Sequence, residues 1–204
     1  MAGSLLLKPD GLSTGCFYRT SIFEALAPIR ESGFSLIEIS SSPGHFDFLN
    51  PDELKRLATR LRDLELVPFS FHAPLREELD ITAADEGRRR RAVEQILTVA
   101  EAAAGLQAGH LIVHPGPDHL LYDLRRQIGR RLRVLYAHDN HGGRDDHLPP
   151  GQGRIDWELL LRRLAEQKFE GPLILELSGD HSSTLLQDAR SGREVLERIK
   201  GQLS

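Results

Sequence analysis

Histidine residues occupy one kind of position in this sequence. Eight of the nine histidines stand at or shortly after the C-terminal end of a short apolar run, and only His110 precedes its run. Stretches with helical periodicity separate the runs, and this alternation predicts a parallel sheet whose strand C-termini share one edge. We therefore expect the histidines to converge on that edge. The eight are His45, His72, His114, His119, His138, His141, His147 and His181.

Acidic residues fall at the same strand ends. Glu38 and Glu176 lie within apolar runs, and Asp139 and Asp145 follow the run at residues 134–136. Imidazole and carboxylate groups together form a ligand set for transition metals. The pattern predicts a metal site on this edge, and zinc or manganese is favoured over magnesium because imidazole ligands are available.

The bulk composition indicates one globular domain over residues 1–204. Hydrophobic residues make up 40% of the chain and charged residues 27%, which is ordinary for such a protein. The single cysteine, Cys16, fits a reducing compartment, and residues 1–8 lack the features of a signal peptide. No apolar run approaches the roughly 20 residues needed to span a bilayer. We therefore expect a cytoplasmic protein without a membrane partner, and the net charge of −4 counts against a nucleic-acid partner.

The chain reads as six strand–helix units. Ser21 and Asn50 are predicted helix N-caps, Gly33 is a helix stop, and the third helix is expected over residues 86–104. The expected buried side of this third helix consists of Val93, Ile96, Leu97, Ala100 and Ala104. The fold class is therefore α/β, either an incomplete barrel or an open doubly wound sheet. Neither a G-x-G-x-x-G motif nor a P-loop is present, which counts against a nucleotide-binding sheet.

Residues 138–157 form the most polar stretch of the chain. Asp145 and His147 are two positions apart, so in an extended loop their side chains point the same way and suit one metal ion. The alternative is a polar loop in which aspartate and asparagine side chains make local turn hydrogen bonds.

Structural roles compete with functional ones for the other candidates. His72 and His114 could be buried, hydrogen-bonded histidines. Glu176 lies inside the apolar run 173–177, where an unpaired buried carboxylate is costly, so a metal or a cationic partner is favoured. Glu38 has the same context and is a second candidate acid. The four consecutive arginines at 88–91 point in four different directions on a helix. This favours a solvent-exposed surface over a site that binds one phosphate group.

Several motifs resemble those of the xylose-isomerase-like TIM-barrel superfamily. The matching segments span almost the whole chain, and their order and spacing make the set more specific than any one of them. They are residues 33–39, residues 71–74, residues 113–116, the polar stretch 138–157 and residues 171–176. That superfamily holds sugar isomerases and epimerases, inosose dehydratases and abasic-site nucleases of the endonuclease IV type.

The resemblance implies roles for individual residues. It places metal ligands at His72, His114, Asp145, His147 and Glu176. In the isomerase and epimerase members, the carboxylate equivalent to Glu176 binds a divalent metal and acts as a base, so Glu176 is also the expected catalytic residue. Glu38, His138 and Asp139 are expected to bind substrate.

The chain departs from the superfamily pattern in its length. Family members have about eight strands, whereas here only about 18 residues separate Pro117 from the run that resembles the seventh strand. The fifth and sixth strands are therefore expected to be absent, together with the metal ligands that they carry. The histidine of the seventh strand aligns with Tyr136, although His138 is nearby. We expect an open or distorted barrel of about six strands, and a homodimer that covers the gap.

Three functions are compatible with these features. The first is a metal-dependent sugar or sugar-phosphate isomerase or epimerase that transfers a proton next to a carbonyl group of a carbohydrate-like substrate. The second is a metal-dependent phosphoesterase of the endonuclease IV type. The third is a degenerate, non-catalytic member of the superfamily, which the apparent loss of two strands favours.

Overall fold

The computed structural model describes residues 10–42, 44–74, 79, 85–113, 133–141, 146–166, 169–178 and 184–203. Within them, six short parallel strands form one sheet in the order β4-β3-β2-β1-β6-β5. The strands are β1 (Gly11–Ser13), β2 (Leu36–Ser40), β3 (Val67–His72), β4 (His110–Ile112), β5 (Leu135–Ala137) and β6 (Leu173–Leu175). The predicted number and direction of the strands are confirmed.

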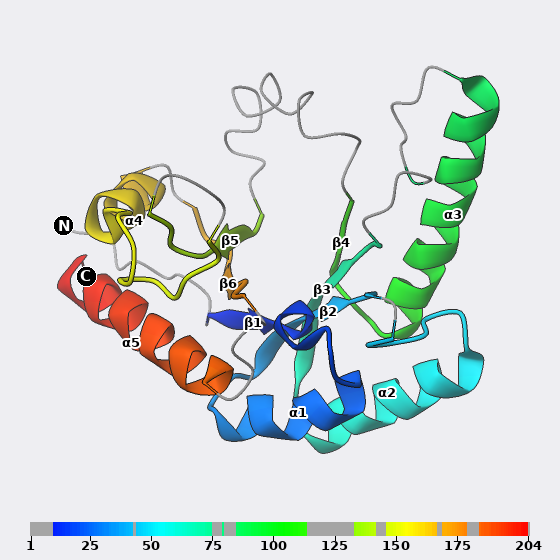
Figure 1. Cartoon of the computed structure of the whole chain (residues 1–204), viewed down its shortest axis with the longest axis horizontal. Coiled ribbons are helices and arrows are strands. Elements are labelled where there is room, and N and C mark those ends of the chain that lie inside the picture. Colours follow the sequence, from blue (N-terminus) through cyan, green and yellow to red (C-terminus); the bar gives the residue numbers. More distant parts are fainter. Residues whose placement is uncertain are drawn as a thin grey trace.

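Helices cover the outside of the curled sheet, as Figure 1 shows. A 3-10 turn, η1 (Thr14–Phe17), follows β1. The helices are α1 (Ile22–Glu31), α2 (Pro51–Asp63), α3 (Glu86–Gly105), α4 (Trp157–Glu166) and α5 (Leu185–Leu203). The strand order is that of a barrel opened between β4 and β5, which remain the two edges of the described sheet. This arrangement confirms an incomplete barrel and excludes a doubly wound sheet.

The helix boundaries follow from local chemistry. Asn50 accepts hydrogen bonds from the amides of Asp52 and Glu53 and so caps α2, as predicted. Ser21 is the N-cap residue of α1, as predicted, but its side chain makes no capping hydrogen bond. After α1, Gly33 has a φ of 86°, a left-handed conformation that glycine adopts without strain.

The predicted buried side of α3 is wrong. Val93 and Leu97 are 45% and 58% exposed. The residues of α3 that pack inward are Ala92, Val99, Ala102 and Ala103. Three of these four residues are alanine, so the inward side of α3 is formed mainly by small side chains. The four arginines at 88–91 are exposed, as expected.

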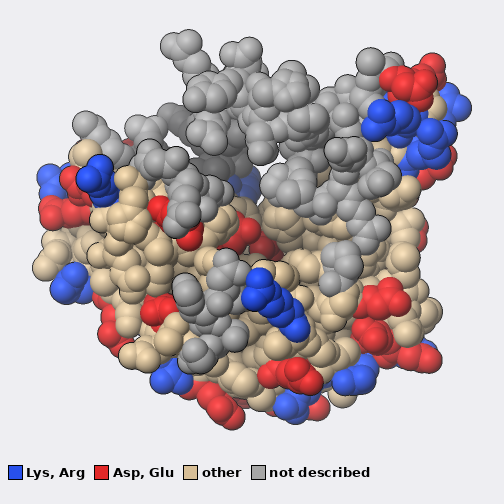
Figure 2. All heavy atoms as spheres, in the orientation of Figure 1, with Lys and Arg blue, Asp and Glu red and all other residues tan. Residues whose placement is uncertain are grey.

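The central strands lie in the core. All three residues of β6 and Leu12 of β1 have no exposed surface, as expected for a parallel sheet covered on its outer face. The visible face carries acidic and basic side chains interspersed over its described part, as Figure 2 shows. In the described residues, no helix is both long and apolar enough to cross a membrane.

Candidate metal centre

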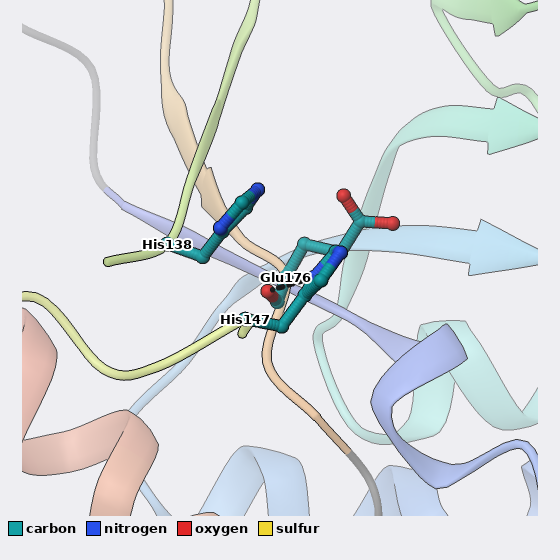
Figure 3. A group of neighbouring side chains, drawn as sticks. All are labelled: His138, His147 and Glu176. Atoms are coloured by element: carbon teal, nitrogen blue, oxygen red, sulfur yellow. Dashed lines mark hydrogen bonds between the residues drawn. The ribbon is translucent and has the colours of Figure 1, made fainter. Parts of the chain in front are cut away.

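Three potential metal ligands meet at the C-terminal ends of β5 and β6. His138 directly follows β5, Glu176 directly follows β6, and His147 lies in the loop after β5. Because Tyr136 pairs in register with Ile174, the residues two positions further along each strand, His138 and Glu176, are neighbours. One ligand atom from each of His138, His147 and Glu176 lies within 4.8 Å of the others, and Figure 3 shows the three side chains side by side.

The orientation of His147 is fixed from two sides. Its Nδ1 lies 2.9 Å from the backbone carbonyl oxygen of Glu176. Since a carbonyl oxygen only accepts hydrogen bonds, Nδ1 carries the proton, and a neutral ring then has its lone pair on Nε2. The backbone carbonyl of His147 accepts from the amide of Ser178 at 3.0 Å, and its φ of 50° is unusual for a residue other than glycine. A backbone carbonyl bound to one imidazole nitrogen is the arrangement that orients histidine ligands in metal sites.

His138 is held against His147. Their rings stack with centroids 4.1 Å apart and planes inclined by 14°. Both side chains are half-buried, as is Glu176. The stacking holds the two imidazole rings next to each other at the rim.

This ligand set fits a divalent transition metal. Two imidazole nitrogens and a carboxylate oxygen are typical donors for zinc, and three protein ligands leave one position for water or substrate. Donors about 2.1 Å from one ion lie about 3.4 Å apart in a tetrahedron. A separation of at most 4.8 Å therefore requires only small side-chain movements to close around an ion.

A buried carboxyl group lies deeper in the sheet. Glu38 of β2 has no exposed surface, and its carboxyl group accepts hydrogen bonds from Ser13 Oγ at 2.8 Å, Ser70 Oγ at 3.2 Å and the hydroxyl of Tyr136. Burial raises the pKa of Glu38, an effect that the nearby His72 partly opposes. Burial also raises the pKa of Tyr136, so its hydroxyl keeps its proton. Three hydroxyl groups therefore surround the carboxyl group of Glu38. The expectation that Glu38 binds substrate stays a prediction.

Asp139 organises the loop between β5 and α4. Its side chain is fully buried, and its carboxylate accepts four hydrogen bonds of 2.9–3.0 Å, from the amides of Asn140, Gly151 and Ile155 and from Nε1 of Trp157. Burial opposes ionisation, but the hydrogen bonds from Trp157 and the backbone outweigh it and lower the pKa of Asp139. These contacts stabilise the loop, as in the predicted alternative of a polar loop held by local hydrogen bonds. They offer no support for a substrate-binding role of Asp139.

The structure brings together only some of the predicted ligands. His147 and Glu176 are neighbours, as predicted, and His138, which was expected to bind substrate, lies with them. His72 is not in this group. It is half-buried at the end of β3, and its ring lies edge-on to that of Tyr136 with centroids 6.2 Å apart. His114 and Asp145 lie outside the described residues.

Sequence reasoning missed the contact between Tyr136 and Glu38. Tyr136 was noted only because it replaces a family histidine. A signal was available, because side chains alternate along a strand and Tyr136 is two positions before His138, so both point to the same side. The serines that bind Glu38 left no comparable signal.

Comparisons with known proteins agree with the geometry. Residues 118–199 match the family model described as xylose isomerase-like TIM barrel. A solved structure of a D-tagatose 3-epimerase-like protein superimposes with a TM-score of 0.75 and 20% identity, covering 96% of this chain and 98% of that one. The chain has the xylose isomerase-like TIM-barrel fold. A xylose isomerase domain protein from Planctomyces limnophilus superimposes similarly, with a TM-score of 0.73, 12% identity and coverage of 97% and 99%.

Two relatives of unassigned function match parts of this xylose isomerase-like chain in sequence. Protein y4fM of Sinorhizobium fredii is 35% identical over 74 residues, which are 36% of this chain and 22% of that protein. This chain therefore covers only about a fifth of y4fM. Protein MJ1311 of Methanocaldococcus jannaschii is 23% identical over 266 residues, covering 92% of this chain and 87% of that protein. Because this alignment is longer than the whole chain, MJ1311 has residues with no counterpart here, as expected if this barrel is abbreviated.

Proposed function

We propose that the protein is a metal-dependent sugar isomerase or epimerase that moves a proton next to a carbonyl group. The observation that carries the proposal is the meeting of His138, His147 and Glu176 at the rim where TIM barrels place their active sites. The similar D-tagatose 3-epimerase-like structure and a D-psicose 3-epimerase structure with D-fructose, which has a TM-score of 0.67 and 11% identity, support a small carbohydrate as substrate.

The proposal assigns the metal to His138, His147 and Glu176, with zinc or manganese favoured by the imidazole ligands. A bound divalent ion would polarise the substrate carbonyl oxygen and so acidify the adjacent carbon. His147 would be held in place through its Nδ1 hydrogen bond to the carbonyl oxygen of Glu176. His114 and Asp145 remain proposed ligands by family resemblance, and His72 is proposed to lie beside the substrate rather than in this three-residue group.

Glu176 is the proposed base. Its carboxylate is half-buried at the rim, where it can reach a substrate and still exchange protons with water. It would take the proton from the carbon next to the carbonyl group and, in an isomerisation, return it to the neighbouring carbon. In an epimerisation, a second group would have to donate a proton to the opposite face of the same carbon.

A carbon–deuterium exchange experiment tests this role. Wild-type protein loaded with zinc or manganese is incubated with D-fructose, D-tagatose or D-psicose in deuterated water, and deuterium on carbon is measured by NMR. Glu176→Gln keeps the shape of the side chain but removes its basicity, so we expect exchange to fall by at least about 100-fold. Glu101→Gln, the same change at an exposed position on α3, is the control. Undiminished exchange in Glu176→Gln would show that another group is the base.

A degenerate, non-catalytic protein is the second candidate. The observation that favours it is the open sheet, in which the described residues supply six strands where a complete barrel has eight. This candidate predicts metal binding without exchange for any sugar. The phosphoesterase alternative gains no support from His72, which does not join the three-residue group.

A further inference from the structure

A groove outside the half-barrel carries positive charge. It lies between α1 and α2, is open to solvent with a volume of about 460 Å³, and is lined by Phe23, Lys55, Arg56, Thr59, Arg60 and Asp63. Five of these six residues lie on α2 within about 140° of its circumference, next to the stripe that packs into the core. Its volume is within the usual range of sites for small molecules. The proposed active site does not use any of these residues.

The three cations in the groove are not neutralised by described partners. Within the described part of the chain, Lys55, Arg56 and Arg60 form no hydrogen bond or ion pair with a carboxylate. Other arginines on the helices do form such pairs, for example Arg90 with Glu86 and Arg162 with Glu158. Lys55, Arg56 and Arg60 thus place three cations without a described carboxylate partner within six residues of α2, on a chain with a net charge of −4.

The groove is also partly preorganised. The guanidinium group of Arg56 lies 3.6 Å from the centroid of the Phe23 ring, and a cation over an aromatic face is attracted to it. This packing limits the freedom of Arg56, so less entropy is lost when it binds a ligand. Arg60, one helical turn away, is half-buried along the same groove.

The two ends of the groove differ in chemistry. The cations occupy residues 55–60, whereas Asp63 closes the far end, about 12 Å from Lys55 along the helix axis. Arginine and lysine side chains bind a phosphate group well. A carboxylate repels a second phosphate but accepts hydrogen bonds from hydroxyl groups. Thr59 lies between the two ends and its hydroxyl already accepts a hydrogen bond from Arg62.

From this arrangement we infer that the groove between α1 and α2 binds a phosphate monoester of a small hydroxylated molecule. The phosphate lies against Lys55, Arg56 and Arg60, and the hydroxyl groups lie toward Asp63. The site is separate from the metal centre, and the inference holds whether or not the protein is an isomerase.

Calorimetric titration of the whole chain at low salt tests the inference, with ribose 5-phosphate, inorganic phosphate and ribose as probes. We expect saturable 1:1 binding of ribose 5-phosphate, weaker binding of inorganic phosphate and none of ribose. Arg60→Ala and Lys55→Ala should each weaken ribose 5-phosphate binding about tenfold, since each removes a charged hydrogen-bond donor. Asp63→Ala should reduce the preference for ribose 5-phosphate over inorganic phosphate.

Two matched variants distinguish binding in this groove from a general charge effect and from binding at the metal centre. Arg88→Ala removes an exposed arginine from α3, and His147→Ala alters the metal centre; both should bind ribose 5-phosphate as wild type does. Equal weakening in Arg88→Ala and Arg60→Ala would reveal a general charge effect and overturn the inference. Loss of binding in His147→Ala would place the phosphate at the metal centre instead and overturn the inference.

Discussion

At the scale of single residues, burial alters the titration of His45. His45 is 2% exposed, and its Nδ1 lies 2.7 Å from the carbonyl oxygen of Thr20. Its Nε2 is buried without a hydrogen-bond partner in the described structure. Burial lowers the pKa of His45, and the backbone groups of Thr20 and Phe17 only partly oppose this effect.

This burial predicts a specific dependence of stability on pH. The pKa of His45 in the folded protein is below its unfolded value of about 6.5. Above that pH the ring is neutral in both states, and its burial makes its full contribution to the free energy of unfolding. The contribution falls as the pH drops below about 6.5, by up to about 1.4 kcal/mol per pH unit. Urea unfolding measures the free energy of unfolding between pH 5 and 7. This free energy should change less steeply with pH in His45→Gln than in wild type.

The control is Gln95→Ala, an exposed change on α3 that removes no group titrating between pH 5 and 7. Its slope should match that of wild type. If His45→Gln and wild type had the same slope, His45 would not be a buried neutral histidine.

The residue scale also shows what the sequence could reveal of the site. His147 and Glu176 were predicted as ligands because of their positions after strands and their family resemblance, and they lie together. The role of His138 was harder to predict. The alternation of side chains along the strand indicates that His138 points inward, but only the register of β5 against β6 places it beside Glu176. Hydrogen bonds between Glu38 and residues up to 98 positions away depend on the complete fold.

At the scale of elements, most strands and helices were predictable and one helix face was not. Caps and stops such as Asn50 and Gly33 act locally, so the sequence determines them directly. The buried face of α3 depends on how closely the helix approaches the sheet. Its sequence has apolar residues on more than one face, and the small residues Ala92, Ala102 and Ala103 pack inward in place of Val93 and Leu97.

The loop between β5 and α4 should depend on Asp139. Replacing Asp139 by alanine leaves several backbone amides and the indole of Trp157 without an acceptor, so we expect a loss of about 2–4 kcal/mol of unfolding free energy. A Cβ at Gly153 would collide with Oδ1 of Asp139, so Gly153→Ala should disturb the same loop. Denaturant unfolding measures both changes.

An exposed aspartate provides the comparison. Asp52→Ala, in the first turn of α2, should cost well under about 1 kcal/mol. A loss in Asp139→Ala no larger than that in Asp52→Ala would contradict the structural role of the buried carboxylate.

At the scale of the whole molecule, the half-barrel leaves β4 and β5 as edges in the described sheet. All of β4 is half-buried among the described residues, as is β5 except for the buried Ala137. Unpaired parallel edges favour association with another chain. We therefore expect a homodimer that covers the gap, and light scattering should give twice the chain mass at micromolar concentration. A stable monomer over a wide concentration range, without binding of an apolar dye, would contradict this expectation.

The direct test of the central claim is the metal content of the protein purified without chelators. Elemental analysis should find about one zinc or manganese ion per chain in wild type. His138→Ala and His147→Ala should each lose most of it, whereas His110→Ala, on a strand at the other edge of the sheet, should keep it. Equal and substantial metal content in His138→Ala, His147→Ala and wild type would show that these residues do not hold a metal, and the proposed active site would have to be abandoned.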